Sequence, residues 1–196
     1  MTRKAFILNF LAAAGILVFS TNIVQALPLA TPQYLPTNSS FSMNFNGGSG
    51  GKANISFDLL GWASLDGVNF YEDDFTLTLN NNEIFKAAFA LGGGGDNSVY
   101  TNTFGLNVAG LQPNIVTFSG GDILISGLLK LAPGNNIFTF SYSALSAGHA
   151  GFQGTGDEAW GVNNLNVSSV PLPPAAILLS TGLLALSRSR RKPQTN

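Results

Sequence analysis

The sequence predicts an all-β protein, an antiparallel jelly-roll-like β-sandwich of eight to ten strands. Apolar and polar residues alternate with a period of two in several segments, which indicates strands with one buried face. Clusters rich in Gly and Asn separate these segments, and both residue types supply the positive φ angles of tight turns. The body between the two chain ends is about 140 residues long. Eight or more strands in one domain of this size indicate two packed sheets.

The alternating segments run from one end of this body to the other. They are residues 41–45, 55–59, 75–79, 137–142 and 162–167. The turn clusters between them are residues 46–51, 80–82, 92–95, 133–136 and 154–157. Residues 27–38 contain three prolines, and proline is tolerated at sheet edges but not in central strands. This segment is therefore expected to form an extended leader or a first edge strand.

The N-terminus has the organisation of a secretory signal peptide. Arg3 and Lys4 form a positive segment, residues 5–18 are apolar, and Val24 and Ala26 are residues that a signal peptidase reads. The sequence predicts a signal helix in residues 1–26, with cleavage by signal peptidase between Ala26 and Leu27. The β-sandwich domain is then expected to span residues 27–169.

The C-terminus has three parts whose order indicates a sorting signal. Residues 170–174 form a proline-rich motif, residues 176–186 are apolar, and a basic cluster follows; the motif is Val170, Pro171, Leu172, Pro173 and Pro174, and the cluster is Arg188, Arg190, Arg191 and Lys192. Arginines at the end of an apolar helix stay in the cytoplasm, so everything before Pro171 is expected to face outwards. A helix over residues 171–187 would reach only about 25 Å against a hydrocarbon core of roughly 30 Å. We therefore expect a short transmembrane helix with a transient stay in the membrane, and a tail at residues 193–196.

This order of motif, apolar helix and basic end resembles the PEP-CTERM sorting segments of bacteria, in particular the variant that begins Val-Pro-Leu-Pro-Ala. The resemblance covers residues 170–192 and implies processing by an exosortase, an integral-membrane cysteine protease or transpeptidase, and delivery to the cell surface, outer envelope or extracellular matrix. Leu172 stands where the family usually has Glu, and Pro174 where it has a small residue. The alternative is an ordinary single-pass anchor without processing.

The charge of the body excludes one class of partner. Between residues 27 and 169 only Lys52, Lys86 and Lys130 are basic, against ten carboxylates, which gives a formal charge of −7. Such a body offers no basic patch to nucleic acid. The chain contains no cysteine, so the fold depends on its hydrophobic core, alone or with a metal.

Two further segments are similar to patterns in exported bacterial jelly rolls. The first comprises residues 64–69, 73–80 and 84–85, a Ser-x-Asp-Gly loop followed by Asp-Phe-x-Leu-x-Leu-Asn and a hairpin. The second, residues 156–167, is similar to a closing strand of the form Asp-Glu-x-Trp-Gly-Ile-Asp-Asn-Val-x-Val. Asn163 stands where Asp is usual, which would weaken a cation site if that position contributes to one.

Five carboxylates lie at predicted strand ends, and two interpretations of them stay open. They are Asp66, Asp73, Asp74, Asp157 and Glu158. Hard oxygen ligands brought together from several loops suit calcium. Asp is also common in turns because it hydrogen-bonds to its own backbone, in which case these residues are solvated.

Aromatic side chains suggest a second kind of site. Trp62, Trp160, Tyr71, Tyr100 and Tyr142 could stack on pyranose rings if they lie in exposed loops. Aromatic residues at alternating strand positions more often belong to the core. Trp160 is expected to plug one end of the sandwich.

The sequence gives little support to an enzyme. Residues 47–51 match a G-x-S-x-G pattern, but a nucleophile elbow needs a following helix and a strand is predicted there. His149 is the only histidine, and residues 92–95 lack the Lys-Ser or Lys-Thr of a phosphate loop. A two-carboxylate glycosidase remains a lower alternative.

The sequence thus predicts an exported, exosortase-sorted surface or matrix protein with a non-catalytic β-sandwich and a structural or adhesive role. The leading alternative is a calcium-dependent carbohydrate-binding module, with polysaccharide as the partner. An ice-binding protein is a lower alternative, because the strands are polar and rich in Asn.

Overall fold

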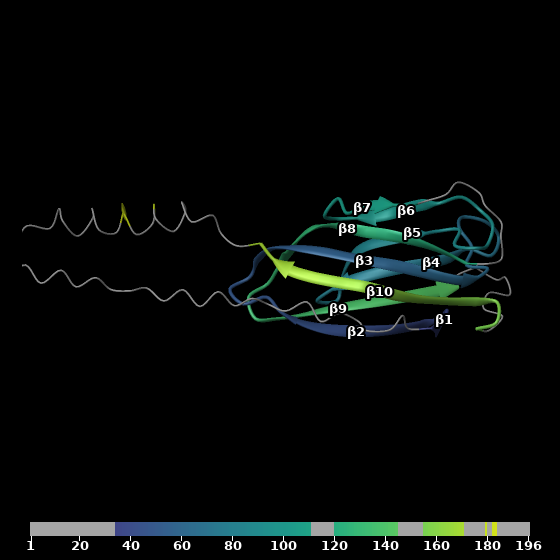
Figure 1. Ribbon diagram of the computed structural model, residues 1–196, viewed down its shortest axis with the longest axis horizontal. Coiled ribbons are helices and arrows are strands. Elements are labelled where there is room, and N and C mark those ends of the chain that lie inside the picture. The colour runs from purple at the N-terminus through teal and green to yellow at the C-terminus, as the bar shows by residue number, and fades with distance from the viewer. Residues whose placement is uncertain (1–33, 111–119, 145–154, 171–178, 180–181, 184–196) are drawn as a thin grey trace, which may run out of the picture.

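The computed structural model describes residues 34–110, 120–144, 155–170, 179 and 182–183. Ten strands in these residues form two five-stranded antiparallel sheets (Figure 1), which confirms the predicted jelly-roll-like β-sandwich. The first sheet has the order β1 (Leu35–Pro36), β10 (Glu158–Ser169), β3 (Gly51–Ala63), β8 (Gly121–Leu131) and β7 (Asn107–Ala109). The second has the order β2 (Ser39–Asn46), β9 (Asn135–Ala144), β4 (Asp73–Leu79), β5 (Asn82–Ala88) and β6 (Ser98–Asn102).

The alternating segments of the sequence all lie in strands, namely in β2, β3, β4, β9 and β10. The turn at residues 80–81 joins β4 to β5 directly, with φ angles of 52° at Asn80 and 65° at Asn81. Two consecutive positive φ angles are typical of a type I′ hairpin, whose twist suits the strands beside it. Within the proline-rich segment, Leu35 and Pro36 form the short edge strand β1, while residues 27–33 lie outside the described residues.

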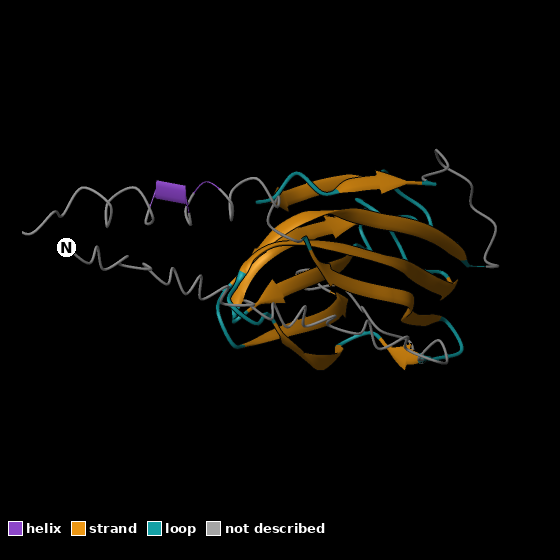
Figure 2. Ribbon diagram, turned by 60° about the vertical axis from the view of Figure 1, so that its left-hand side comes forward, coloured by secondary structure: helices purple, strands orange, loops and turns teal. Residues whose placement is uncertain are grey.

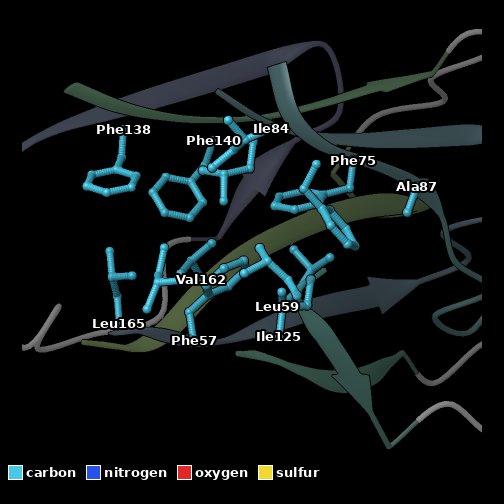
Figure 3. Packing of buried hydrophobic residues seen from close by; sticks show 14 of the residues in the cluster. Phe57, Leu59, Phe75, Ile84, Ala87, Ile125, Phe138, Phe140, Val162 and Leu165 are labelled. Atoms are coloured by element: carbon cyan, nitrogen blue, oxygen red, sulfur yellow. The ribbon is translucent and has the colours of Figure 1, made fainter. Parts of the chain in front are cut away.

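The core between the sheets is rich in aromatic rings (Figure 3). Phe75 contacts four other rings, at centroid distances of 5.9 to 6.4 Å. Trp160 is fully buried, and its Nε1 donates hydrogen bonds to the carbonyl of Pro36 at 2.9 Å and to the hydroxyl of Ser39 at 3.2 Å. A buried indole needs such an acceptor. Trp160 and Tyr142 therefore belong to the core.

Three connecting segments meet at one end of the sandwich, which we call the loop end: residues 64–72, 89–97 and 155–157. Backbone hydrogen bonds join them, from the Ser64 amide to the Asp157 carbonyl (2.7 Å), from Leu91 to Leu65 (3.0 Å) and from Val68 to Asp96 (2.7 Å). Figure 2 shows the two layers of strands that these segments connect.

Strand β10 starts at the loop end and runs to the opposite end, which we call the tail end. Its first residue pairs with Ala63 and its last with Ala53. Twelve extended residues cover about 40 Å. At the tail end the amide of Val170 donates to the carbonyl of Lys52 at 2.8 Å, so the chain leaves the sandwich far from the loop end (Figure 1).

The terminal predictions fall almost entirely outside the described residues. These are the signal helix with its cleavage site between Ala26 and Leu27, residues 171–174 of the sorting motif and the basic cluster at residues 188–192. Leu179, Gly182 and Leu183 are helical. Within the described part of the chain, no helix has the length and hydropathy needed to cross a membrane.

Candidate functional site

Two carboxylates brace the loop between β3 and β4. Oδ2 of Asp73 accepts a hydrogen bond from the amide of Asp66 at 2.8 Å, and the carbonyl of Asp66 accepts one from the amide of Asp73 at 3.1 Å. Oδ1 of Asp66 accepts from Nδ2 of Asn69 at 2.9 Å and from the amide of Gly94 at 2.7 Å. These bonds close the loop on itself and fasten it to its neighbour at the loop end.

Burial changes the protonation of the carboxyl groups in this loop. The side chain of Asp73 is fully buried, and burial, together with the nearby carboxylate of Glu158, raises its pKa to about 8. Asp73 is therefore mostly protonated in the folded protein at neutral pH. Its Oδ1 and the hydroxyl of Tyr142 have no hydrogen-bond partner among the described residues. Burial also raises the pKa of Asp66 and that of Glu158.

The five candidate calcium ligands are not brought into one cluster. Glu158 accepts a hydrogen bond from the hydroxyl of Thr37 at 3.0 Å, and Asp157 accepts one from the hydroxyl of Ser64 at 2.9 Å. Asp74 lies on the opposite side of β4 from Asp73. Among the described residues, no group of three or more acidic, histidine or cysteine side chains is arranged to hold a metal. Calcium binding by these residues stays a prediction.

The alternative that all five carboxylates are solvated turn residues is wrong. Asp73, Asp74 and Glu158 are buried. Asp74 forms an ion pair with Lys86, with 2.9 Å between Oδ2 and Nζ. The alternation of inward and outward residues along the strands could have predicted the burial of two of these carboxylates. Asp73 shares the inward parity of Phe75, and Glu158 shares that of Trp160.

The braced loop presents aromatic side chains to solvent. Phe70 and Tyr71 are 55% and 47% exposed, and their rings meet edge to face with centroids 5.0 Å apart. Tyr100 on β6 is 47% exposed, and its hydroxyl donates to Oε1 of Glu72 at 2.5 Å. We call Phe70, Tyr71, Glu72 and Tyr100 the aromatic patch. Exposed apolar groups that cluster in this way make the patch a candidate interaction surface.

Of the aromatic residues singled out from the sequence, Tyr71 and Tyr100 are exposed and Trp62 is partly exposed. Sequence reasoning did not find Phe70 and Glu72. Two adjacent aromatic residues cannot both point inwards as alternate residues of a strand do. This adjacency was the feature of the sequence that could have indicated an exposed aromatic residue.

The patch combines flat apolar faces with polar groups held in place. The Tyr100 ring lies 5.8 Å from Nζ of Lys86, and burial together with the bond to Glu72 raises the pKa of Tyr100. The side chain of Asn69 accepts from the amide of Tyr71 at 2.5 Å. These contacts restrict the Tyr100 ring and the backbone at Tyr71, and a surface that is already ordered loses less conformational entropy when it binds a partner.

No family model matches the sequence, and no curated protein matches it. Two solved structures are similar to the chain at low identity. The crystal structure of a ruminal GH26 endo-β-1,4-mannanase has 10% identity and a TM-score of 0.35, over 76% of this chain and 22% of that one. A family 35 carbohydrate binding module from Clostridium thermocellum has 11% identity and a TM-score of 0.32, over 72% of this chain and 100% of that one. The chain thus spans about a fifth of the mannanase's length, and likenesses at these TM-scores carry no functional information.

Proposed function

We propose that the chain is an exported surface protein whose β-sandwich adheres, without catalysis, to neutral extracellular polysaccharide through the aromatic patch. The observation that carries this proposal is the position of the patch. It lies at the loop end, whereas the proline-rich motif begins with Val170 at the tail end. A chain held through its C-terminal segment would present the patch about 40 Å from the attachment point.

The chemistry of the patch favours a sugar polymer. Aromatic rings can stack on the apolar faces of pyranose rings, while Glu72 and the Tyr100 hydroxyl can exchange hydrogen bonds with sugar hydroxyls. The body has only three lysines against ten carboxylates. Its negative field repels acidic polymers, so the proposed ligand is neutral.

Export and sorting complete the proposal. Signal peptidase would cut between Ala26 and Leu27, and an exosortase would process the motif that starts at Val170 and release the protein to the surface or matrix. Intact mass of exported protein, from a host with an active exosortase, tests this part. A species that retains Leu183 and Arg191 would overturn the sorting signal.

Adhesion is tested by depletion of the exported protein onto insoluble cellulose, mannan and curdlan. Replacing both Phe70 and Tyr71 by Ala should weaken binding on the order of tenfold, since stacked aromatic anchors dominate such interfaces. Leu128→Ala is the matched control, because Leu128 is 48% exposed on β8 towards the tail end. Equal binding by the double variant and the control, or no binding to any of the three polymers, would reject the proposal.

The calcium-dependent alternative is tested in the same assay. The hydrogen bonds of Asp66 and Asp73 close the patch loop without a metal, so binding should survive an excess of chelator. Loss of binding in chelator, with recovery on added calcium, would instead support a calcium-dependent module.

A further inference from the structure

A second aromatic surface lies on the outer face of the first sheet. Trp62 on β3 projects outwards beside Ala159, and two residues earlier Leu60 lies beside Gly161. Because β10 presents only these small residues here, the ring of Tyr34, just before β1, meets Trp62 across β10. The two centroids are 5.1 Å apart with the rings at 60°. We call Tyr34 and Trp62 the aromatic shelf.

The shelf is held in place by contacts on both sides. The hydroxyl of Tyr34 donates to the carbonyl of Thr155, and the next residue, Leu35, pairs with Trp160 in the sheet. Tyr34 is nevertheless 52% exposed, and Trp62 is partly exposed. An exposed aromatic pair that is already ordered loses little conformational entropy when a ligand stacks on it.

Polar groups continue from the shelf along the same outer face. Asp122 on β8 pairs with Leu60, and Asp58 on β3 pairs with Asn163 on β10. Oδ2 of Asp58 accepts a hydrogen bond from Nδ2 of Asn164 at 2.6 Å. These acceptors and amides lie within a few residues of the rings, as a ligand with both flat faces and hydroxyls requires.

The charge on this face selects among sugar polymers. The carboxylates Asp58 and Asp122 lie near the shelf. The lysines of these strands, Lys52 and Lys130, are at the tail end, where they occupy opposite positions in the register of β3 and β8. An acidic polymer on the shelf would meet like charge, which disfavours it. A neutral chain can donate its hydroxyls to both carboxylates.

We propose that the aromatic shelf is a second site for a neutral polysaccharide chain, which stacks on Trp62 and Tyr34 and donates hydroxyls to Asp58 and Asp122. The shelf belongs to the first sheet, and the patch belongs to the loop before β4 and to β6 of the second sheet. The site goes beyond the proposed function because it stands whether or not the patch binds. Two sites would let one molecule link two polymer chains, with a gain in avidity.

The chain contains two tryptophans, and this makes the shelf measurable. Trp160 is fully buried, so acrylamide quenching of tryptophan fluorescence in the exported protein reports mainly on Trp62. Cellohexaose, mannohexaose and laminarihexaose are the probes. Saturation with at least one of them should reduce the quenching constant about twofold, while polygalacturonate should not.

Variants separate the shelf from the patch. Tyr34→Ala should weaken binding of the hexasaccharide that protects Trp62 on the order of tenfold. Leu128→Ala should leave this binding unchanged. The Phe70→Ala, Tyr71→Ala double variant should retain full protection, so a failure of the patch leaves this test intact. In calorimetry of proteins that also carry Phe70→Ala and Tyr71→Ala, Trp62→Phe should keep binding at the shelf and Trp62→Ala should lose it, with an unchanged melting temperature as the check on folding.

Two results would overturn the shelf as a sugar site. One is unchanged quenching with all three hexasaccharides. The other is protection of Trp62 that rises with protein concentration in the absence of sugar, which would show that a second copy of the chain covers the shelf.

Discussion

Replacing Asp73 by Asn should abolish most of the pH dependence of stability at neutral pH. The carboxyl is fully buried, and its pKa is about 8 in the folded protein against an ordinary value of 3.8. The folded state therefore holds a proton that the unfolded chain releases above about pH 4. The contribution of Asp73 to the free energy of unfolding is therefore fully present below pH 4. It falls between pH 4 and pH 8 and levels off above the pKa of the folded state.

The magnitude follows from one proton. Each pH unit inside this window removes about 1.4 kcal/mol from the free energy of unfolding, so a rise from pH 5 to pH 7 removes about 3 kcal/mol. Asn is neutral at every pH, and its carbonyl oxygen can still accept the hydrogen bond from the amide of Asp66. Burial also raises the pKa values of Asp66, Asp74 and Glu158, and these groups contribute slopes of the same sign in the wild type and in the variant.

Urea unfolding of the exported protein and of Asp73→Asn at pH 5, 6, 7 and 8 measures both slopes. The variant should be the more stable protein at pH 7, and the two should converge towards pH 4. Asp122→Asn is the matched control, because Asp122 is exposed on β8, and it should keep the steep slope. Parallel profiles for the wild type and Asp73→Asn would refute a protonated Asp73.

Three further substitutions test the packing around the site, each by urea unfolding. Phe75→Ala removes a ring that packs on four others and should cost about 3–5 kcal/mol; a cost below about 1 kcal/mol would contradict this packing. Lys86→Met leaves the buried carboxylate of Asp74 without its cation and should cost about 2–3 kcal/mol at pH 8. The loss should be smaller at pH 5, since burial raises the pKa of Asp74. Gly92→Ala would place a Cβ 2.0 Å from a backbone carbonyl oxygen at a φ of +100° and should destabilise far more than Gly48→Ala, where φ is +58° and the space is open. Equal effects at the two glycines would contradict the close approach at the loop end.

The alternation of the sequence was enough to predict the main strands but not their partners. It reports which side chains face the core, and β2, β3, β4, β9 and β10 follow it. Strand β2 nevertheless pairs with β9 rather than with β3, which follows it in the chain. That choice depends on how two apolar faces pack together, and local patterns do not contain it. Strand β8 was missed because Leu124 and Leu128 are exposed, which obscures its alternation.

The sequence predicted some residues of the candidate site but not the contacts between them. The sequence located the carboxylates and Tyr71 and Tyr100, but it offered only ligation or solvation as roles for the acidic residues. The structure gives Asp66 and Asp73 a third role, because their hydrogen bonds close the loop that carries Phe70. Such a role depends on contacts between segments distant in sequence, for example Asp66 with Gly94. Period and composition alone do not report these contacts.

Backbone amide chemical shifts recorded while a soluble neutral hexasaccharide is added test adhesion through the aromatic patch most directly. The hexasaccharide would be chosen as the soluble form of the polymer retained in the depletion assay. The proposal predicts shift changes at residues 68–72 and along Ser98–Asn102, with a separate group at Tyr34 and Trp62 if the aromatic shelf also binds. Unchanged shifts at residues 68–72 and in β6, under conditions where the polymer retains the protein, would contradict the proposed site.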